Sequence, residues 1–210
     1  MPRFYYKSSV VLLLMLGLLS LPTSCTSGEF LKVRSSPLAG SWYPGDPALL
    51  KKMLVDQLDR AEIPPLRGKT AALISPHAGY QYSAPAAACG FKTIVGGTYD
   101  RVLIIGPSHY ARFHGICISS YDCYETPLGE VPVDTIVTKE LARHTLFHAL
   151  PTAEEREHSV EMQLPFLQMC LGRFQIIPLI VGDLQDKDYA EVAAALRPSV
   201  SATTLVVVST

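Results

Sequence analysis

Apolar residues cluster along this chain in short runs that show little alternation with polar residues. Runs of this kind are typical of strands buried on both faces, as in a parallel sheet that helices cover. Longer segments with the 3.6-residue period of helices separate several of the runs. The predicted strands lie at residues 71–75, 101–105, 116–119, 174–181 and 204–209.

The segments with a helical period also carry helix start signals. A helix is predicted over residues 47–60, with Asp46 as its N-cap and Pro47 in its first turn. Pro165 lies inside another predicted helix and should kink or divide it. The remaining predicted helices span about 83–95, 135–148, 159–171 and 187–197, opened by Ser83, Asp134, Ser159 and Asp186.

Strands that alternate with helices predict the α/β class. We expect a single domain over residues 33–210, with a mixed or largely parallel sheet flanked by helices. The N-terminal segment is expected to be separate from this domain. Arg3 and Lys7 precede an uncharged run at residues 8–21, which has about the length of a signal-peptide core and is shorter than the roughly 20 residues that span a bilayer.

Residues 21–25, Leu-Pro-Thr-Ser-Cys, resemble a bacterial lipobox. The prediction is that residues 1–24 are a signal peptide and that Cys25 is lipidated. The protein would then be an exported bacterial lipoprotein, anchored through its lipid to a membrane of the cell envelope, on the periplasmic or the outer face. A plainly cleaved secretory signal and a retained anchor are the alternatives.

Composition excludes some classes of function. Lys and Arg number 18 against 19 Asp and Glu, and no polybasic run occurs, so a nucleic-acid partner is not expected. The sequence lacks the G-x-S-x-G elbow of serine hydrolases and the glycine patterns of Rossmann and P-loop proteins. The cysteines at positions 89, 117, 123 and 170 form no C-x-x-C pair. We expect buried free thiols at Cys89 and Cys170, whereas Cys117 and Cys123 are close enough in sequence to pair but need not.

Candidate chemistry gathers where predicted strands end. His77 follows the strand at 71–75 and His109 follows the strand at 101–105, each within a turn. Because α/β proteins bind ligands beyond the carboxyl ends of their strands, the two imidazoles could meet at one site. Imidazoles suit Zn, Cu or Fe, but structural histidines and metal-free acid–base chemistry remain open.

A third polar cluster occurs at a predicted helix start. His158 and Glu161 are three residues apart, which places them on one face if the helix includes both. Glu154, Glu155 and Glu157 are expected to form a solvated first helical turn, where acidic side chains favour the helix dipole.

Five motifs then occur in an order that resembles the Memo-like family, whose bacterial and archaeal members are called AmmeMemoRadiSam system protein B. The resemblance covers the chain from about Val33 onward and implies a fold similar to LigB-type class III extradiol dioxygenases. The motifs are AGSWYP at 39–44, SPHAGY at 75–80, GPSH at 106–109, ETPLG at 125–129, and HSVE at 158–161 followed by LPF at 164–166.

The resemblance implies that His77 and His109 are ligands of a single metal ion, Fe(II) or Cu. It also implies that Trp42 and Tyr80 contact a substrate, either a small molecule or a peptide. By name, the family is associated with an AMMECR-type protein and a radical-SAM protein. The third ligand of the family, a Cys, and an Asp-x-x-His motif would follow the strand at 204–209 and do not occur before Thr210, so we expect the domain to be incomplete at its C-terminus.

The leading hypothesis is a Memo-like, metal-binding α/β protein with a site built on His77 and His109 and with His158 near it; a ring-cleaving or other oxidative reaction at this site would need an open coordination position. In it His158 acts as acid or base, or orients Glu161 as the second catalytic residue. The alternative is a scaffold that binds a metal or ligand without turnover and retains a vestigial dioxygenase site.

Overall fold

The computed structural model describes residues 31–210, which form one compact unit. The predicted signal peptide and Cys25 lie outside the described residues. Among residues 31–210, no helix is both long enough and apolar enough to cross a membrane.

The centre of the unit is a six-stranded sheet in the order β2-β9-β3-β8-β4-β7. Strands β2, β9, β3 and β8 run parallel, β4 is antiparallel to β8, and β7 is parallel to β4. This confirms the predicted α/β class with a mixed, largely parallel sheet. The strands are β2 (Ala72–Ser75), β3 (Arg101–Pro107), β4 (Ile116–Ile118), β7 (Phe147–Ala149), β8 (Gln175–Val181) and β9 (Thr204–Ser209).

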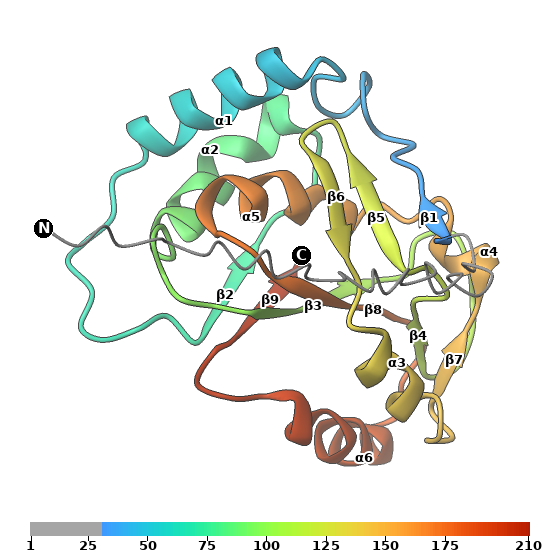
Figure 1. Ribbon diagram of the computed structural model, residues 1–210. Helices are drawn as coiled ribbons and strands as arrows, with labels where there is room; N and C mark the ends of the chain where they lie inside the picture. The colour runs from blue at the N-terminus through green and yellow to red at the C-terminus, as the bar shows by residue number, and fades with distance from the viewer. Residues whose placement is uncertain (1–30) are drawn as a thin grey trace, which may run out of the picture. The chain divides into compact units, whose positions relative to one another are not determined.

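Helices cover both faces of the sheet. Three of them, α1, α2 and α5, lie on one side, and α3 and α6 lie on the other (Figure 1). The alternating residues of β3 divide accordingly: Val102 and Ile104 face the larger apolar cluster, whereas Leu103 and Ile105 face the smaller one. The helices are α1 (Pro47–Arg60), α2 (Tyr80–Lys92), α3 (Thr135–Leu141), α4 (Pro151–Glu154), α5 (Leu164–Cys170) and α6 (Asp186–Leu196), with short 3₁₀ turns η1 (Glu161–Gln163) and η2 (Arg197–Ser199).

Two local predictions from proline are confirmed. The side chain of Asp46 accepts a hydrogen bond from the amide of Leu49 and caps α1, which ends at Arg60 as predicted. Pro165 lies in the first turn of α5, and the predicted helix at 159–171 is divided into η1 and α5 at this point. A proline has no amide hydrogen to donate, so only the first turn of a helix accommodates it without loss.

Two helix predictions are wrong at their ends. The helix predicted at 83–95 begins three residues earlier, and the hydroxyl of Ser83 donates to the carbonyl of Ala78 from inside α2. The helix predicted at 135–148 stops at Leu141, because Phe147 belongs to β7 and pairs in register with Ile116 of β4. Both side chains are buried there, and this packing outweighs local helix propensity.

Strand β2, at one edge of the main sheet, is more exposed to solvent than its apolar sequence predicts. Strand β2 alternates exposed and buried residues, and the side chain of Ile74 is 72% exposed. A second sheet was not predicted from the sequence; in it β1 runs parallel to β5, and β5 forms an antiparallel hairpin with β6. Its strands are β1 (Val33–Arg34), β5 (Cys123–Thr126) and β6 (Gly129–Pro132).

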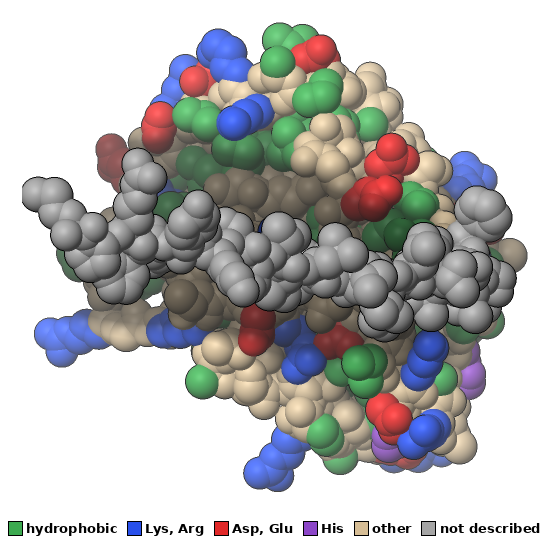
Figure 2. All heavy atoms as spheres, viewed as in Figure 1, with side chains coloured by type: hydrophobic (Ala, Val, Ile, Leu, Met, Phe, Trp, Pro, Cys, Tyr) green, Lys and Arg blue, Asp and Glu red, His purple; other side chains and the backbone are tan. Residues whose placement is uncertain are grey.

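Surface charge and cysteine states agree with the composition. On the face shown in Figure 2, basic and acidic side chains are interspersed, and no continuous basic patch is visible among the coloured residues. Cys89, Cys117, Cys123 and Cys170 are free thiols. Burial raises the pKa of Cys117 and that of Cys170 to about 12, so neither thiol forms a thiolate readily.

Asp134 supplies a first prediction. Its carboxylate caps α3 through the amide of Val137 and accepts two hydrogen bonds from Arg101, at 2.6 and 2.9 Å. Replacing Asp134 by alanine should lower the free energy of unfolding by about 1 to 3 kcal/mol, measured by urea denaturation. Asp46→Ala is the matched control, because Asp46 caps α1 without an ion-pair partner among the described residues. Equal losses would show that the Arg101 contact adds nothing to the cap.

Candidate metal centre

Two histidines follow the carboxyl ends of parallel strands that flank a third strand, β9. Strand β2 ends at Ser75, two residues before His77, and β3 ends at Pro107, two residues before His109. Strand β9 lies between β2 and β3 and holds the first turn, since the amide of His77 donates to the carbonyl of Thr210. The two imidazole centroids are 5.1 Å apart. The prediction that strand ends bring the two rings together is therefore realised in the structure.

His158 completes a cluster of three imidazoles. It lies between α4 and η1, and its ring centroid is 5.2 Å from that of His77 and 4.1 Å from that of His109. One nitrogen from each ring can be chosen so that all three lie within 4.8 Å of one another. Such a cluster can hold one transition-metal ion. The sequence had suggested a role for His158 near the site, and the geometry places it beside the two candidate ligands.

Glu157 fixes the orientation of His109. One carboxylate oxygen accepts from Nδ1 of His109 at 2.9 Å, and the other accepts from the amide of His109 at 2.7 Å. A carboxylate can only accept, so Nδ1 of His109 carries a proton, and in the neutral ring Nε2 keeps a free lone pair. Ligand histidines in metal sites are commonly held by such a carboxylate.

The expectation of a solvated acidic turn is wrong for two of its three residues. The side chains of Glu154 and Glu157 are each 1% exposed, whereas Glu155 is exposed. Burial alone would raise the pKa of Glu157, but the amides of Ser159 and His109 and the His109 ring donate to the carboxylate and lower the pKa below its ordinary value. The only feature of the sequence that could have indicated a role for Glu157 at the site is its position directly before His158.

His77 is held by a hydroxyl instead of a carboxylate. Its Nδ1 lies 2.9 Å from the hydroxyl oxygen of Ser209, the last residue of β9. Ser209 is in register with Ser75, so the pairing of β9 with β2 brings the hydroxyl to the ring. Gly106 provides space on the other side of β9, because a Cβ at that position would collide with the side chain of Ser159. Neither Ser209 nor Gly106 was predicted to belong to the site.

His158 is the least constrained of the three rings. Its Nδ1 is buried, has no hydrogen-bond partner, and lies 3.4 Å from a carboxylate oxygen of Glu157. Trp42 packs against this ring with centroids 4.6 Å apart. Burial and the nearby His109 lower the pKa of His158, and Glu157 opposes this effect. His158 offers one ring nitrogen to the cluster of three imidazoles.

The neutral state of His77 gives a pH prediction. Burial, with His158 and His109 nearby, lowers its pKa from 6.5 to about 4. Between these values the unfolded chain binds a proton at this residue and the folded chain does not, so stability should fall as the pH drops from 6.5 to about 4. Thermal unfolding of the wild type and of His77→Asn, which cannot titrate there, measures the effect. Identical pH slopes for the two proteins would contradict the prediction.

Glu161 lies in a separate buried network. Arg34 donates to one carboxylate oxygen at 2.7 Å, and the hydroxyls of Ser36 and Tyr43 contact the other at 2.7 Å each. No hydrogen bond joins Glu161 to His158 in the described part of the chain. Arg34 also donates to the carbonyls of residues 154, 155 and 157, and thereby ties the strand β1 to the loop that carries Glu157.

An open pocket of about 560 Å³ adjoins the cluster and is lined mainly by apolar surface. Trp42 and Tyr82 contribute aromatic rings to its lining, and His77 and His158 of the cluster also line it. Tyr80 does not line this pocket: it is 3% exposed and its hydroxyl donates to the carbonyl of Met162. Of the two predicted substrate contacts, Trp42 lines the pocket and Tyr80 is buried in the core.

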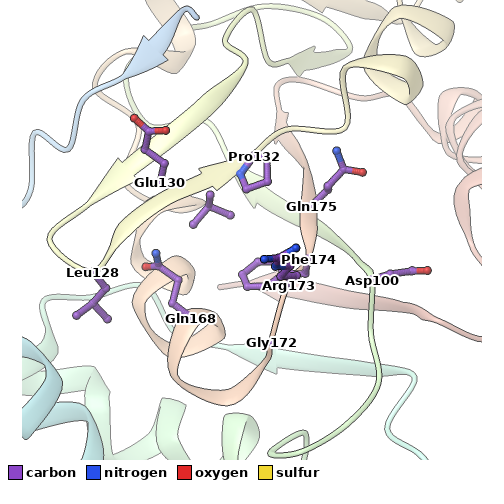
Figure 3. Close-up of a pocket in the computed structure, with 10 residues that line it drawn as sticks. Asp100, Leu128, Glu130, Pro132, Gln168, Gly172, Arg173, Phe174 and Gln175 are labelled. Carbon is purple, nitrogen blue, oxygen red and sulfur yellow. The ribbon is translucent and has the colours of Figure 1, made fainter. Parts of the chain in front are cut away.

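A second cavity, of about 460 Å³, lies at the opposite ends of the strands. Asp100 precedes β3 and Gln175 begins β8, so this cavity is at their amino ends (Figure 3). Leu128, Gln168 and Phe174 also line it, and no histidine does. The candidate metal ligands all belong to the other edge of the sheet.

The fold and the site together define an α/β protein with a three-histidine cluster at the carboxyl edge of a largely parallel sheet. Residues 34–210 match the family model described as Memo-like protein. The chain is 43% identical over 154 residues to a protein memo-1 homolog of Caenorhabditis elegans, covering 72% of this chain and 43% of that one. This chain belongs to the Memo-like protein family.

Archaeal and mammalian relatives extend the comparison. A MEMO1 family protein of Methanopyrus kandleri is 33% identical over 190 residues, which cover 84% of this chain and 67% of that protein. Protein MEMO1 of Mus musculus is 32% identical over 163 residues, which cover 75% of this chain and 54% of that protein. The chain spans about half the length of the curated relatives that it matches.

Proposed function

We propose that His77, His109 and His158 hold one transition-metal ion, Fe(II) or Cu, in a site related to those of extradiol dioxygenases. The observation that carries this proposal is the convergence of three imidazoles whose ligand atoms lie within 4.8 Å of one another. The hydrogen bonds to Ser209 and Glu157 leave Nε2 of His77 and His109 free to bind. Imidazole donors suit both metals.

The metal, when bound, would supply a redox-active Lewis acid with coordination positions left for O₂ or substrate. The residues of the chain would bind the substrate and hold the metal ligands in position. Trp42 and Tyr82 would bind an apolar, preferably aromatic, small molecule in the adjoining pocket. Glu157 would maintain the orientation of His109, and the role of Glu161 would be to hold Arg34 and the surrounding loop in place. His158, which contacts Trp42 and lines the pocket, would be the metal ligand closest to a molecule bound against Trp42.

A non-catalytic scaffold is the second candidate. It is favoured by the use of Glu161, the predicted partner of His158 in catalysis, in a buried network with Arg34, Ser36 and Tyr43. In this case the cluster would bind a metal or a peptide ligand without turnover. The AMMECR-type and radical-SAM proteins associated with the family by name would be the first partners to examine.

The test is the metal content of the full chain purified without oxygen, measured by elemental analysis. Near-stoichiometric Fe or Cu is expected in the wild type and should be lost in His77→Ala/His109→Ala. The double variant His114→Ala/His144→Ala is the matched control, because both residues lie away from the cluster and should not affect metal content. A folded wild type without metal after incubation with Fe(II) and Cu would overturn the proposal.

Consumption of O₂ separates the enzyme from the scaffold. The metal-loaded protein should consume O₂ in the presence of a catechol if the site is an oxygenase, and the products should show ring opening by mass spectrometry. Bound metal without any O₂ uptake over a panel of catechols would favour the scaffold.

We also propose the cell envelope as the site of action, through lipidation of Cys25 after removal of residues 1–24. The support is the sequence pattern of the N-terminal segment alone. In a bacterial host fed labelled palmitate, the wild type should become labelled and Cys25→Ser should not. Label on both proteins, or on neither, would contradict the assignment.

A further inference from the structure

We infer that Ser209 and Gln163 are positioning residues that fix His77 in the tautomer able to bind a metal through Nε2. The functional purpose of this arrangement rests on the proposed metal site, whereas the hydrogen bonds themselves are present in the metal-free protein. Both residues are buried: Ser209 is 3% exposed and Gln163 is fully buried. Neither residue lies in a motif that the sequence had singled out.

The hydroxyl group of Ser209 has one hydrogen to donate, and its neighbours decide which of them receives it. The oxygen of Ser209 has three polar neighbours: the carbonyl of Ser159 at 2.6 Å, Nε2 of Gln163 at 2.8 Å and Nδ1 of His77 at 2.9 Å. A carbonyl can only accept and an amide NH₂ can only donate. The single hydroxyl hydrogen therefore goes to Ser159, and the Ser209 oxygen must accept from His77. Nδ1 carries the imidazole proton, and Nε2 is left unprotonated.

The orientation of the Gln163 amide is fixed independently of Ser209. Its Nε2 also lies 3.2 Å from the carbonyl of Pro76 and 3.4 Å from that of Ser159, both of which are acceptors. Turning the amide round would bring its oxygen against these carbonyls. Gln163 thereby connects the turn before His77 with the segment after His158. The alternative in which Ser209 donates to His77 is blocked by the carbonyl of Ser159, which takes the only hydroxyl hydrogen at 2.6 Å, while the Gln163 amide occupies one of the two lone pairs of the Ser209 oxygen.

His77 and His109, two of the three proposed ligands, are consequently held by different hydrogen-bond acceptors. His109 donates to a carboxylate, whereas His77 donates to a neutral hydroxyl whose own hydrogen is engaged elsewhere. Removing the hydroxyl leaves Nδ1 of His77 without its acceptor, so the ring is free to turn or to exchange tautomers. Loss of a partner of this kind typically weakens metal affinity about 10- to 100-fold.

Nitrogen-15 imidazole spectra of the metal-free full chain at neutral pH test the inference directly. His77 should show the Nδ1–H tautomer in the wild type and should lose this preference in Ser209→Ala. Ser209→Thr, which keeps the hydroxyl, should restore it. The control is Thr204→Val, which removes a buried hydroxyl at the opposite end of β9 and should leave the His77 signals unchanged.

Binding of Co²⁺ as a spectroscopic probe gives the second measurement. Ser209→Ala should bind about 10- to 100-fold more weakly than the wild type, with Ser209→Thr in between. An unaltered His77 tautomer in Ser209→Ala, or an Nε2–H tautomer in the wild type, would overturn the inference whatever the protein binds. The expected tautomers together with no metal binding in the wild type would uphold the positioning role and reject the proposed metal site.

Discussion

Replacing Glu157 by glutamine is expected to weaken metal binding about 10- to 100-fold. The carboxylate accepts from Nδ1 and the amide of His109 and also from the amides of His158 and Ser159. Glutamine has only one acceptor oxygen, so its NH₂ group must face at least one of these donors. Either the backbone amide or the ring of His109 would then face an NH₂ group instead of an acceptor, so the ring would be held less firmly. Titration with Co²⁺, followed by its absorption spectrum, measures the change in affinity.

Glu154→Gln provides the matched control for Glu157→Gln. Glu154 is equally buried in the same segment, but its carboxylate accepts from the hydroxyl of Tyr124 and from Ser120 instead of from a histidine. Both variants should lose stability, since both place an amide where a buried carboxylate accepted several hydrogen bonds. Only Glu157→Gln should lose metal affinity. Equal affinity in the two variants would show that Glu157 does not orient His109.

The second large effect is expected at Arg34, whose replacement by alanine should lower the free energy of unfolding by about 3 to 5 kcal/mol. The side chains of Arg34 and Glu161 are 2% and 0% exposed, and their ion pair is 2.7 Å long. Removing the guanidinium leaves a buried carboxylate without its counter-charge and removes a donor from three backbone carbonyls. Urea denaturation followed by circular dichroism measures the loss.

Two further variants isolate the cause at Arg34. Arg143→Ala breaks an ion pair with Glu140 whose side chains are 74% and 58% exposed, and its stability should be nearly unchanged. Arg34→Met/Glu161→Gln removes both buried charges and should recover part of the stability lost in Arg34→Ala. A double variant that is less stable than the single one would place the cost in packing and not in an uncompensated charge.

Much of the fold was predictable because its signals are local. Continuous apolar runs predicted β3, β8 and β9, and a cap followed by a proline predicted α1 from its first residue to its last. Pro165 correctly predicted a divided helix. The errors fall where distant contacts decide the conformation. Phe147 leaves the predicted helix because β4 offers it a paired position in a buried layer.

The candidate site divides in the same way. Its ligands were predictable, because a histidine in a turn after a buried strand must lie at the carboxyl edge of the sheet. The residues that hold these ligands in place were not predictable from the sequence. Glu157 has the sequence context of a solvated first turn, and Ser209 that of an ordinary strand end; both acquire their contacts only when the loop folds over the edge of the sheet.

By itself, then, the sequence determined the α/β class, the strands of the sheet's centre and the meeting of His77 with His109, because apolar periodicity and strand direction are properties of neighbouring residues. The tertiary structure alone decided the rest. It brought His158 into the cluster, engaged Glu161 with Arg34, and placed the acceptors of Glu157 and Ser209 beside the rings. The hydrogen bond of His109 with Glu157 joins residues 48 positions apart, and that of His77 with Ser209 joins residues 132 positions apart. Such contacts depend on how distant segments pack, and no local sequence pattern encodes them.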